Sequence, residues 1–216
     1  MHADASLALE VGGEHLVALA DRALYWPARG RLLLADLHLG KGDVFRRAGI
    51  AVPTGGTAHD LARIDALLDA TGARELLVLG DIIHGPVPDA AWRTKWLAWR
   101  AARPALRVGV VAGNHDRALR RAELALDLLP EVVRDGGLVL RHDPVPSADG
   151  VVLAGHLHPC FGVPGMRRRW PGFWWRGRAG LLVLPAFSAF TGGFRAELAP
   201  GERALLCVDG ALVPIG

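Results

Sequence analysis

The sequence is poor in cysteine, with only Cys160 and Cys207 among its 216 residues. Two cysteines exclude the disulfide framework that holds many small secreted domains together, and they predict reduced thiols. No apolar stretch approaches the roughly 20 residues that a membrane-spanning helix needs. The N-terminal residues also lack a basic segment followed by an apolar one, which is the pattern of a signal peptide. These absences predict a cytoplasmic protein that does not associate with membranes.

Lysine is almost absent as well, because Lys41 and Lys95 are the only two lysines in the chain. Arginine therefore carries nearly all of the positive charge, and arginine is the better bidentate partner for phosphate. A compositional bias of the genome explains the same ratio equally well. The formal net charge of +3 is too small to indicate nucleic-acid binding by itself. With 51% hydrophobic residues, the chain is expected to form one domain over residues 1–216.

Apolar runs bounded by glycine, proline and polar residues predict short buried strands separated by helices. After a hairpin or meander over residues 7–26, the expected strands cover residues 32–35, 75–79, 106–112, 138–140, 151–154, 180–184 and 204–208. The expected helices cover residues 60–71, 90–102 and 117–129, and a loop is expected over residues 41–56. This order predicts a largely parallel sheet in the first two-thirds and a second, more antiparallel sheet in the tail.

Polar side chains that can bind metal follow the predicted strands, at the point where each strand ends. They are Asp36, His38, Asp81, Asn114, His115, Asp116, His142, His156 and His158. Taken singly, each has an ordinary explanation, such as a helix N-cap for Asp81 or a turn residue for Asn114. Ligands of parallel sheets collect at the carboxyl ends of the strands. The joint occurrence of these residues at strand ends therefore favours a binding site.

The set fits two metal ions that share Asp81, because one carboxylate offers two oxygens. One ion would be completed by Asp36, His38 and His158, and the other by Asn114, His142 and His156. Four imidazoles argue against magnesium, whereas manganese, iron or zinc suit mixed nitrogen and oxygen ligands. Two such ions about 3.5–4 Å apart clamp phosphoryl oxygens during an in-line attack.

His115 is the histidine of this set that we do not assign to metal. Adjacent side chains diverge on extended backbone, so His115 should point away from Asn114 and into the substrate space. There it would donate a proton to the leaving oxygen or stabilise charge on the phosphoryl group. Asp116 has two explanations of equal weight: it holds the His115 imidazole in the right tautomer, or it caps a helix that begins at Arg117.

The blocks Asp36-x-His38, Gly80-Asp81, Gly113-Asn114-His115-Asp116, His142 and Gly155-His156-x-His158 resemble the calcineurin-like metallophosphoesterase superfamily. They occur in the order of that family, over residues 31–158. The resemblance implies an α/β fold, the metallophosphoesterase four-layer α/β/β/α sandwich of two mixed sheets flanked by helices. It also implies a dinuclear metal centre at the strand ends, and the ligand roles given above coincide with the family pattern.

Shorter blocks are similar to the bacterial ligase-associated DNA damage response endonucleases. These blocks are Ala-Asp-Leu-His-Leu-Gly-Lys at 35–41, Phe-Arg-Arg-Ala-Gly at 45–49, Gly-Asp-Ile-Ile-His at 80–84 and Pro-Ala-Phe at 185–187. The similarity implies two Mn²⁺ ions, a DNA substrate and association with a DNA ligase, helicase or exonuclease repair system. Lys41, Arg46 and His84 lie in these blocks and are expected to contact the substrate phosphate. Residues 85–89 depart from the pattern and leave one wall of the substrate cleft undefined.

Two further patterns have competing explanations. Trp92, Trp96 and Trp99 recur on one face of a helix, which fits core packing, a dimer face or base stacking. Residues 167–178 interleave arginine with aromatic residues, as nucleic-acid paths do. An exposed hairpin with its tryptophans packed beneath it would give the same pattern.

Three functions are compatible with these observations. The main hypothesis is a dinuclear-metal phosphodiesterase or endonuclease that acts on nucleic acid in DNA repair. The enzyme alternative is a hydrolase of a small phosphorylated metabolite, such as a cyclic nucleotide or a pyrophosphate-linked compound. The third is a scaffold without turnover, against which the intact ligand set and His115 argue. The oligomeric state is open, with a dimer as one option.

Overall fold

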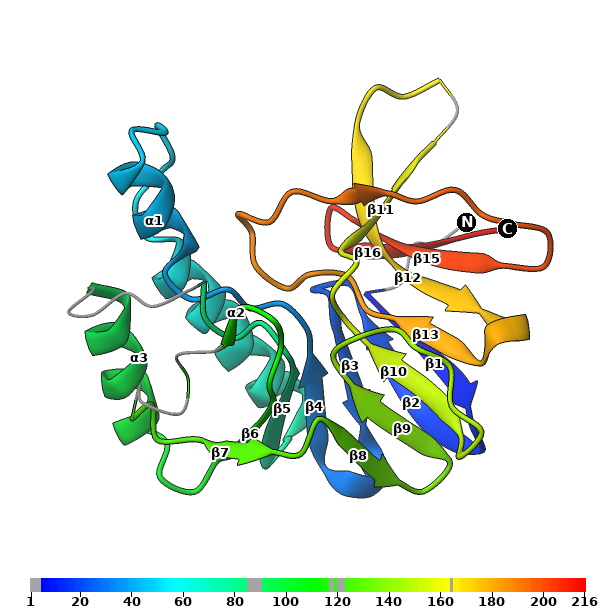
Figure 1. Ribbon diagram of the computed structural model, residues 1–216, viewed down its shortest axis with the longest axis horizontal. Coiled ribbons are helices and arrows are strands. Elements are labelled where there is room, and N and C mark those ends of the chain that lie inside the picture. The colour runs from blue at the N-terminus through cyan, green and yellow to red at the C-terminus, as the bar shows by residue number, and fades with distance from the viewer. Residues whose placement is uncertain (1–4, 85–90, 117–118, 120–122, 164) are drawn as a thin grey trace.

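Two β-sheets stacked face to face form the middle of the structure (Figure 1). The structure is a computed structural model that describes residues 5–84, 91–116, 119, 123–163 and 165–216. The first sheet has seven strands in sequence order: β1 (Ser6–Val11), β2 (Glu14–Leu19), β3 (Ala23–Trp26), β4 (Arg31–Leu34), β5 (Glu75–Leu79), β6 (Arg107–Val111) and β7 (Asp127–Leu129). Strands β1 to β4 form the expected antiparallel meander, and β4 to β7 are parallel.

The second sheet has nine strands, ordered β14-β11-β12-β13-β10-β9-β8, with β15 paired to both β12 and β16. Their bounds are β8 Val132–Asp135, β9 Leu138–Arg141, β10 Val151–Ala154, β11 Pro159–Gly162, β12 Arg169–Arg176, β13 Leu181–Val183, β14 Phe194–Arg195, β15 Arg203–Val208 and β16 Ala211–Ile215. Strands β9, β10 and β13 are parallel, whereas β12 pairs antiparallel with β11, β13 and β15. Both sheets are therefore mixed.

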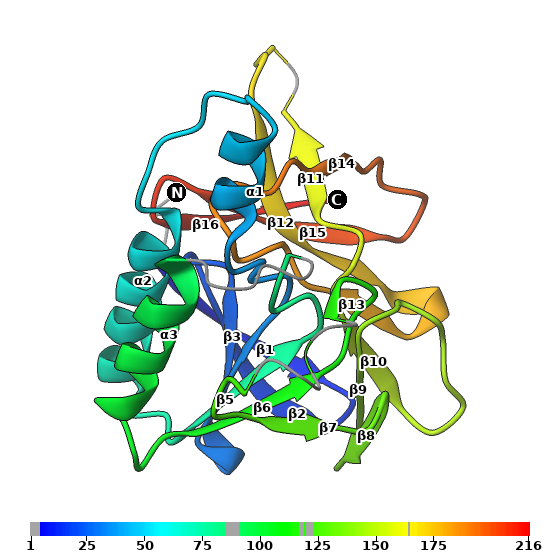
Figure 2. The ribbon, with the colours of Figure 1, turned by 60° about the vertical axis from the view of Figure 1, so that its left-hand side comes forward.

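Three α-helices occur among the described residues: α1 (Lys41–Arg47), α2 (Gly56–Thr71) and α3 (Ala91–Ala101). Two short 3₁₀ helices, η1 and η3, cover Pro27–Arg29 and Gly177–Ala179. Helices α2 and α3 lie side by side against the outer face of the first sheet (Figure 2). Within the described part of the chain, no helix is long and apolar enough to cross a membrane. This architecture confirms the predicted α/β fold of two mixed sheets flanked by helices.

The central strands are buried on both faces because successive side chains of a strand point to opposite sides. Leu32 and Leu34 pack with Leu61 of α2 in the core beneath the helices. Leu33 packs instead with Leu140 in the core between the two sheets. An unbroken run of leucines thus serves two cores, which is why the sequence shows a continuous apolar stretch without alternation.

The three tryptophans of α3 pack in the core beneath the helices, as the first of their explanations proposed. Trp96 is completely buried, and its indole N–H donates to the backbone oxygen of Leu124 at 2.7 Å. Trp99 is 7% exposed and donates its indole N–H to the Asp65 carboxylate at 2.7 Å. Side chains buried in this way are not free to form a dimer face or to stack on bases.

Residues 41–56 do not form the expected loop throughout, because residues 41–47 are the helix α1. The helix begins after Gly40, whose φ of 83° lies in the left-handed region that favours glycine. An ion pair between Asp43 and Arg46, three residues apart, supports the helix from its polar side. Helix α1 is hard to predict from the sequence because none of its residues is fully buried, so no apolar periodicity marks it.

The helix expected over residues 117–129 is wrong at its C-terminal end, where Asp127–Leu129 forms strand β7 beside β6. Glu123 and Ala125 have φ values of 46° and 52°, which a right-handed helix does not allow. Residues 117, 118 and 120–122 of that prediction lie outside the described residues. The last leucines of the segment therefore complete the parallel sheet instead of a helical face.

The aromatic residues within 167–178 belong to the core, as the hairpin explanation proposed. Strand β12 buries Phe173 to 1% exposure, and Trp170 and Trp174 to 7% each. Trp174 also donates its indole N–H to Glu202 at 2.9 Å, and Arg176 binds the other oxygen of the same carboxylate at 2.9 Å. This part of the stretch stabilises the second sheet and offers no open face for a base.

We expect Trp96→Ala to destabilise the fold by about 3–5 kcal/mol, the usual range for removing a buried tryptophan. The cost has two sources, namely the cavity left behind and the unpaired backbone oxygen of Leu124. Urea denaturation followed by circular dichroism measures it. The neighbouring exposed Lys95, changed to alanine, is the matched control and should alter the free energy of unfolding by about 0.5 kcal/mol or less. Equal losses in the two variants would contradict the assignment of Trp96 to the core.

Candidate metal centre

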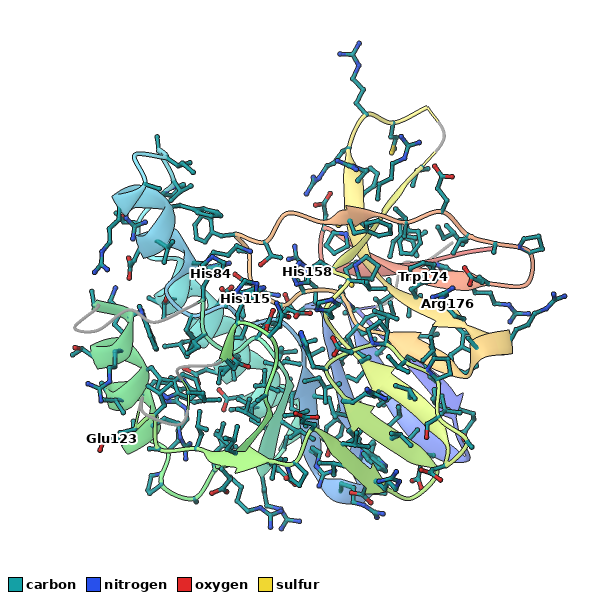
Figure 3. All side chains as sticks on the ribbon, in the orientation of Figure 1. His84, His115, Glu123, His158, Trp174 and Arg176 are labelled. Carbon is teal, nitrogen blue, oxygen red and sulfur yellow. The ribbon has the colours of Figure 1, made fainter. Side chains whose placement is uncertain are left out.

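The candidate site lies where strands of both sheets end on the same side of the sandwich. In the first sheet, Leu34 pairs with Val78, and Leu79 pairs with Val111, so β4, β5 and β6 end at the same level. In the second sheet, β9 and β10 end beside them, followed by the predicted histidine ligands. Figure 3 shows His84, His115 and His158 gathered between the two halves of the molecule. Parallel strands thus bring together residues far apart in sequence.

One group of potential ligands is formed by Asp36, His38, Asp81 and His158. Their ligand atoms all lie within 4.8 Å of one another. The Nε2 atom of His158 is 3.3 Å from the Asp36 carboxylate and 3.4 Å from Nε2 of His38. Asp36, His38 and Asp81 are at most 3% exposed. Two buried carboxylates facing imidazole nitrogens at this spacing fit a cation.

The second group centres on His142, whose two ring nitrogens face different partners. Its Nδ1 lies 3.0 Å from the backbone oxygen of Leu79, and because a carbonyl only accepts, Nδ1 carries the hydrogen of this bond. Its Nε2 faces Oδ1 of Asn114 at 3.0 Å and Nδ1 of His156 at 3.1 Å. Nitrogen and oxygen ligand atoms gathered in this way, with the ring held from its other side by a backbone carbonyl, fit a second cation.

Asp81 stands between the two groups, as a bridging ligand would. It belongs to the first group, and its Oδ1 is only 3.6 Å from Nε2 of His142 in the second. The same oxygen accepts the backbone N–H of His115 at 2.9 Å, which fixes the carboxylate. The residues that we assigned to each ion from the sequence are thus brought together in the same two groups.

The backbone at the site is unusual because most of the predicted ligands have a left-handed conformation. Positive φ values between 47° and 72° occur at Asp36, His38, Asp81, His156 and His158. Each such residue costs about 1–3 kcal/mol unless the surroundings enforce it. Cross-loop hydrogen bonds do so here: the N–H of Asp36 donates to Gly80 at 3.1 Å, and the N–H of His38 donates to Asp81 at 2.8 Å.

Glycines beside the ligands leave the space that the ligands fill. A Cβ added to Gly113 would overlap the Asp81 carboxylate, and one added to Gly80 would overlap the His142 ring. Gly80 also has a φ of 80°, which disfavours any side chain at that position. The glycines in the Gly-Asp and Gly-Asn-His-Asp blocks are therefore required by the packing of the site.

Asp116 connects the loops that carry the ligands. Its carboxylate accepts backbone N–H groups from Gly113 at 2.8 Å, Ile83 at 3.0 Å and Ile82 at 3.3 Å. Burial raises the pKa of Asp116, and the hydrogen bonds from Gly113 and Ile83 oppose that rise. No hydrogen bond recorded for the described residues joins this carboxylate to the His115 ring. The carboxylate thus ties the loop after β5 to the loop after β6, while its role toward His115 stays a prediction and the helix expected from Arg117 begins outside the described residues.

Burial also sets the charge state of the imidazoles near the first group. Burial, with the charge of Lys41 as the next cause, lowers the pKa of His38 to about 2. The same two causes lower the pKa of His84 to about 4. Both rings are therefore neutral near pH 7. A neutral imidazole has a free lone pair, which is the form that binds a metal.

His115 stands on the open side of the site. Its ring is 43% exposed, and Nε2 lies 3.9 Å from the Asp81 carboxylate. The His84 ring stacks on it with centroids 5.1 Å apart and planes 25° apart. His115 is thus held next to the shared carboxylate while one face remains accessible, as a group that contacts substrate must be.

Of the three residues expected to contact substrate phosphate, two lie near the site. Lys41 is partly buried, with its Nζ atom 3.4 Å from Thr191, and His84 packs between His38 and Phe45. Arg46 is different, because its guanidinium binds Asp43 and the backbone oxygen of Pro53. These bonds tie α1 to the following loop, and a contact of Arg46 with substrate stays a prediction.

Asp143 is a residue of the site that the sequence interpretation did not assign. Its carboxylate belongs to the group of ligand atoms around His142 and His156, 3.7 Å from Nδ1 of His156. The side chain is 58% exposed. Its position directly after His142 is the only sign in the sequence, and strand alternation would have placed it on the opposite face.

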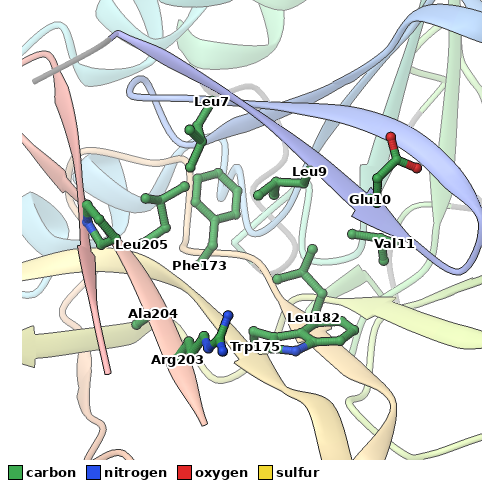
Figure 4. Close-up of a pocket in the computed structure, with 11 residues that line it drawn as sticks. Leu7, Leu9, Glu10, Val11, Phe173, Trp175, Leu182, Arg203, Ala204 and Leu205 are labelled. Atoms are coloured by element: carbon green, nitrogen blue, oxygen red, sulfur yellow. The ribbon is translucent and has the colours of Figure 1, made fainter.

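An apolar cavity of about 300 Å³ lies away from this centre, between β1 and the strands β12, β13 and β15 (Figure 4). Its walls include Leu9, Phe173, Trp175, Leu182 and Leu205. None of the predicted metal ligands lines it. The cavity therefore reflects imperfect packing between the sheet ends and is not part of the candidate centre.

Comparison with known proteins gives two clear matches. A family model described as calcineurin-like phosphoesterase matches residues 31–179. Among solved structures, the nuclease MPE of Pseudomonas putida is 36% identical, with a TM-score of 0.85 over 97% of this chain and 100% of that chain. The E. coli phosphoesterase Yfce is more distant, at 18% identity and a TM-score of 0.45 over 86% of this chain and 97% of that chain. No curated protein sequence matches this one.

We expect Gly113→Ala to lower metal content, because the added methyl group displaces the Asp81 carboxylate from both ligand groups. Inductively coupled plasma mass spectrometry of the purified variant measures bound metal per chain. Gly192→Ala is the matched control, since a Cβ there meets no atom within 4 Å. Full metal content in both variants would show that Asp81 does not depend on the space at Gly113.

Asp81→Asn should also release metal, while leaving the fold intact. The amide keeps the size of the side chain but removes the charge that both groups share. Metal content and the far-ultraviolet circular dichroism spectrum together test this. Two bound ions and full hydrolysis in the variant would rule out Asp81 as the bridge.

Proposed function

The chain belongs to the calcineurin-like phosphoesterase family, and from this premise we propose that it is a manganese-dependent phosphodiesterase that cleaves nucleic acid. Membership shows the coarser activity, a metal-dependent phosphoesterase with a dinuclear site. The nucleic-acid substrate and the identity of the metal are our proposals.

The observation that carries the proposal is the pair of ligand groups joined by Asp81, with His115 beside them on the open side. Asp36, His38, Asp81 and His158 would hold one ion, and Asp81, Asn114, His142 and His156 the other. Two divalent ions supply Lewis-acid polarisation of the phosphoryl group and a nucleophile at neutral pH. Oxygen and nitrogen donors in this mixture suit Mn²⁺, with Fe or Zn as alternatives.

His115 is the residue that we propose to act on the leaving group. Its backbone N–H is fixed by Asp81, and stacking on His84 restricts its ring. The imidazolium form would donate its Nε2 proton to the departing oxygen as the phosphorus–oxygen bond breaks. Asp116 contributes indirectly, because it connects the loop that carries His115 to the loop that carries Asp81.

The openness of the site supports a polymer as substrate. On the side of the second group, Asn114 is exposed, and the side chains of His156 and Asp143 are 39% and 58% exposed. Small-molecule sites usually enclose most of their ligand. A long strand that passes over the centre needs no such enclosure. The similarity to a solved nuclease points the same way.

The narrower resemblance extends the proposal to a cellular role. We propose that the protein acts on DNA in the cytoplasm, in a repair system that includes an ATP-dependent DNA ligase. Residues 1–216 are proposed to form one domain, because the core between the sheets draws residues from both. A screen of the manganese-loaded protein against DNA, RNA and small phosphodiesters tests the substrate class. Turnover of small metabolites alone would contradict it.

We expect the His115→Ala variant to retain its metals and to hydrolyse DNA about 10²–10⁴-fold more slowly than the wild type. A factor of this size is the usual contribution of general acid catalysis. The loss should be smaller for bis(p-nitrophenyl) phosphate, because nitrophenolate leaves without a proton. His15→Ala, at an exposed position on β2, is the control and should keep full activity. Equal losses on both substrates would indicate that His115 binds phosphate instead of donating a proton.

A further inference from the structure

A groove of about 820 Å³ runs between the β11–β12 hairpin and residues 195–198. Arg167 and Arg169 line it from the hairpin, and Arg195 lines it from β14. All three side chains are exposed. Figure 1 shows the β11–β12 hairpin projecting from the second sheet.

The positive charge of this groove is poorly neutralised. Among the described residues, no side-chain hydrogen bond or ion pair is recorded for Arg167 or Arg169. Arg195 lies 3.5 Å from Glu197, but both side chains are more than 70% exposed, so the pair is weak. Among the described residues that line the groove, Glu197 is the only acidic one. An anion with several charges in a row would satisfy these guanidinium groups.

Strand β11 links the groove to the metal centre along the chain. That strand begins at Pro159, directly after the ligand His158. Strand β14 pairs with it in parallel, and the N–H of Phe194 donates to the backbone oxygen of His158 at 3.0 Å. Phe194, next to Arg195, is 56% exposed. An exposed aromatic side chain thus stands beside the backbone of the ligand His158, next in sequence to a residue that lines the groove.

We propose that this groove binds the sugar–phosphate backbone of the nucleic-acid strand whose scissile bond lies at the metal centre. Arg167, Arg169 and Arg195 bind successive phosphates, and Phe194 stacks on a base next to the cleaved bond. The assignment rests on the proposed nucleic-acid substrate. It differs from the nucleic-acid path predicted over residues 167–178, because Trp170 and Trp174 are buried and Arg168 and Arg176 have carboxylate partners.

The test compares two triple variants that lose the same charge. Arg167, Arg169 and Arg195 are changed to alanine in one, and the exposed Arg107, Arg178 and Arg203, away from the groove, in the other. Fluorescence anisotropy measures binding of a labelled DNA oligonucleotide by metal-free and metal-loaded protein. Each lost phosphate contact lowers the slope of log affinity against log salt by about 0.7–0.9. Raising the salt concentration from roughly 50 to 200 mM lowers the DNA affinity of both proteins. This fall in affinity should be about 20-fold smaller for the groove variant than for the wild type.

Phe194→Ala should weaken binding about fivefold or more at every salt concentration, since stacking is not ionic. Phe194→Tyr keeps the aromatic ring and should bind as the wild type does. Hydrolysis of bis(p-nitrophenyl) phosphate should be unchanged in all of these variants, because that substrate reaches only the centre.

The outcomes separate the groove from the proposed function. If the wild type binds and cleaves DNA, and the groove variant keeps the salt slope of the control variant, the groove assignment is wrong and the nuclease proposal stands. If the wild type hydrolyses the small diester but neither binds nor cleaves DNA, both proposals are wrong. If the groove variant also loses small-diester hydrolysis, the arginines support the fold and do not bind the strand.

Discussion

Buried negative charge is the constraint on which the site depends. Asp36 is fully buried and Asp81 is 2% exposed, and neither forms an ion pair with a lysine or arginine among the described residues. Carboxylates in such surroundings need compensating charge, since removing an unpaired ion from water costs several kcal/mol. The imidazoles around them are mostly buried, and His38 is neutral near pH 7. Divalent cations would supply the positive charge that no lysine or arginine provides to these two carboxylates.

The fold meets this constraint with rigid elements. Parallel strands place the carboxylates at one level, and hydrogen bonds between loops hold the backbone in conformations that isolated residues avoid. Asp116 accepts two backbone hydrogen bonds from the loop after β5, given by Ile82 and Ile83, and a third within its own loop from Gly113. The ligands are therefore placed by the backbone more than by side-chain rotamers. A small movement of the loop that carries Asp81 would disturb both ligand groups, because both groups use this carboxylate.

Sequence reasoning predicted most strands well, and it predicted which potential ligands lie together, for a physical reason. Buried parallel strands are continuous apolar runs, and residues directly after them must gather at one edge, so β5 and β10 were placed at their observed bounds. It failed where tertiary contacts decide. Helix α1 has no buried face, and β7 is an edge strand without alternation. Arg46 and Asp116 have their polar atoms occupied by backbone groups that only the fold brings near. Arg195 lines the same groove as Arg167 and Arg169 because β14 pairs with β11, which the sequence does not reveal.

The position of the two ligand groups at the junction of the sheets has a thermodynamic consequence. Asp36, His38 and Asp81 come from the first sheet, whereas His142, His156 and His158 come from the second. An ion bound by both joins the halves of the sandwich and binds the native state in preference to the unfolded chain. Its binding energy is then also folding energy, amounting to about 2.7 kcal/mol when free metal is 100 times its dissociation constant. Metal supply in the cell would thereby influence how long the protein persists, as well as how fast it works.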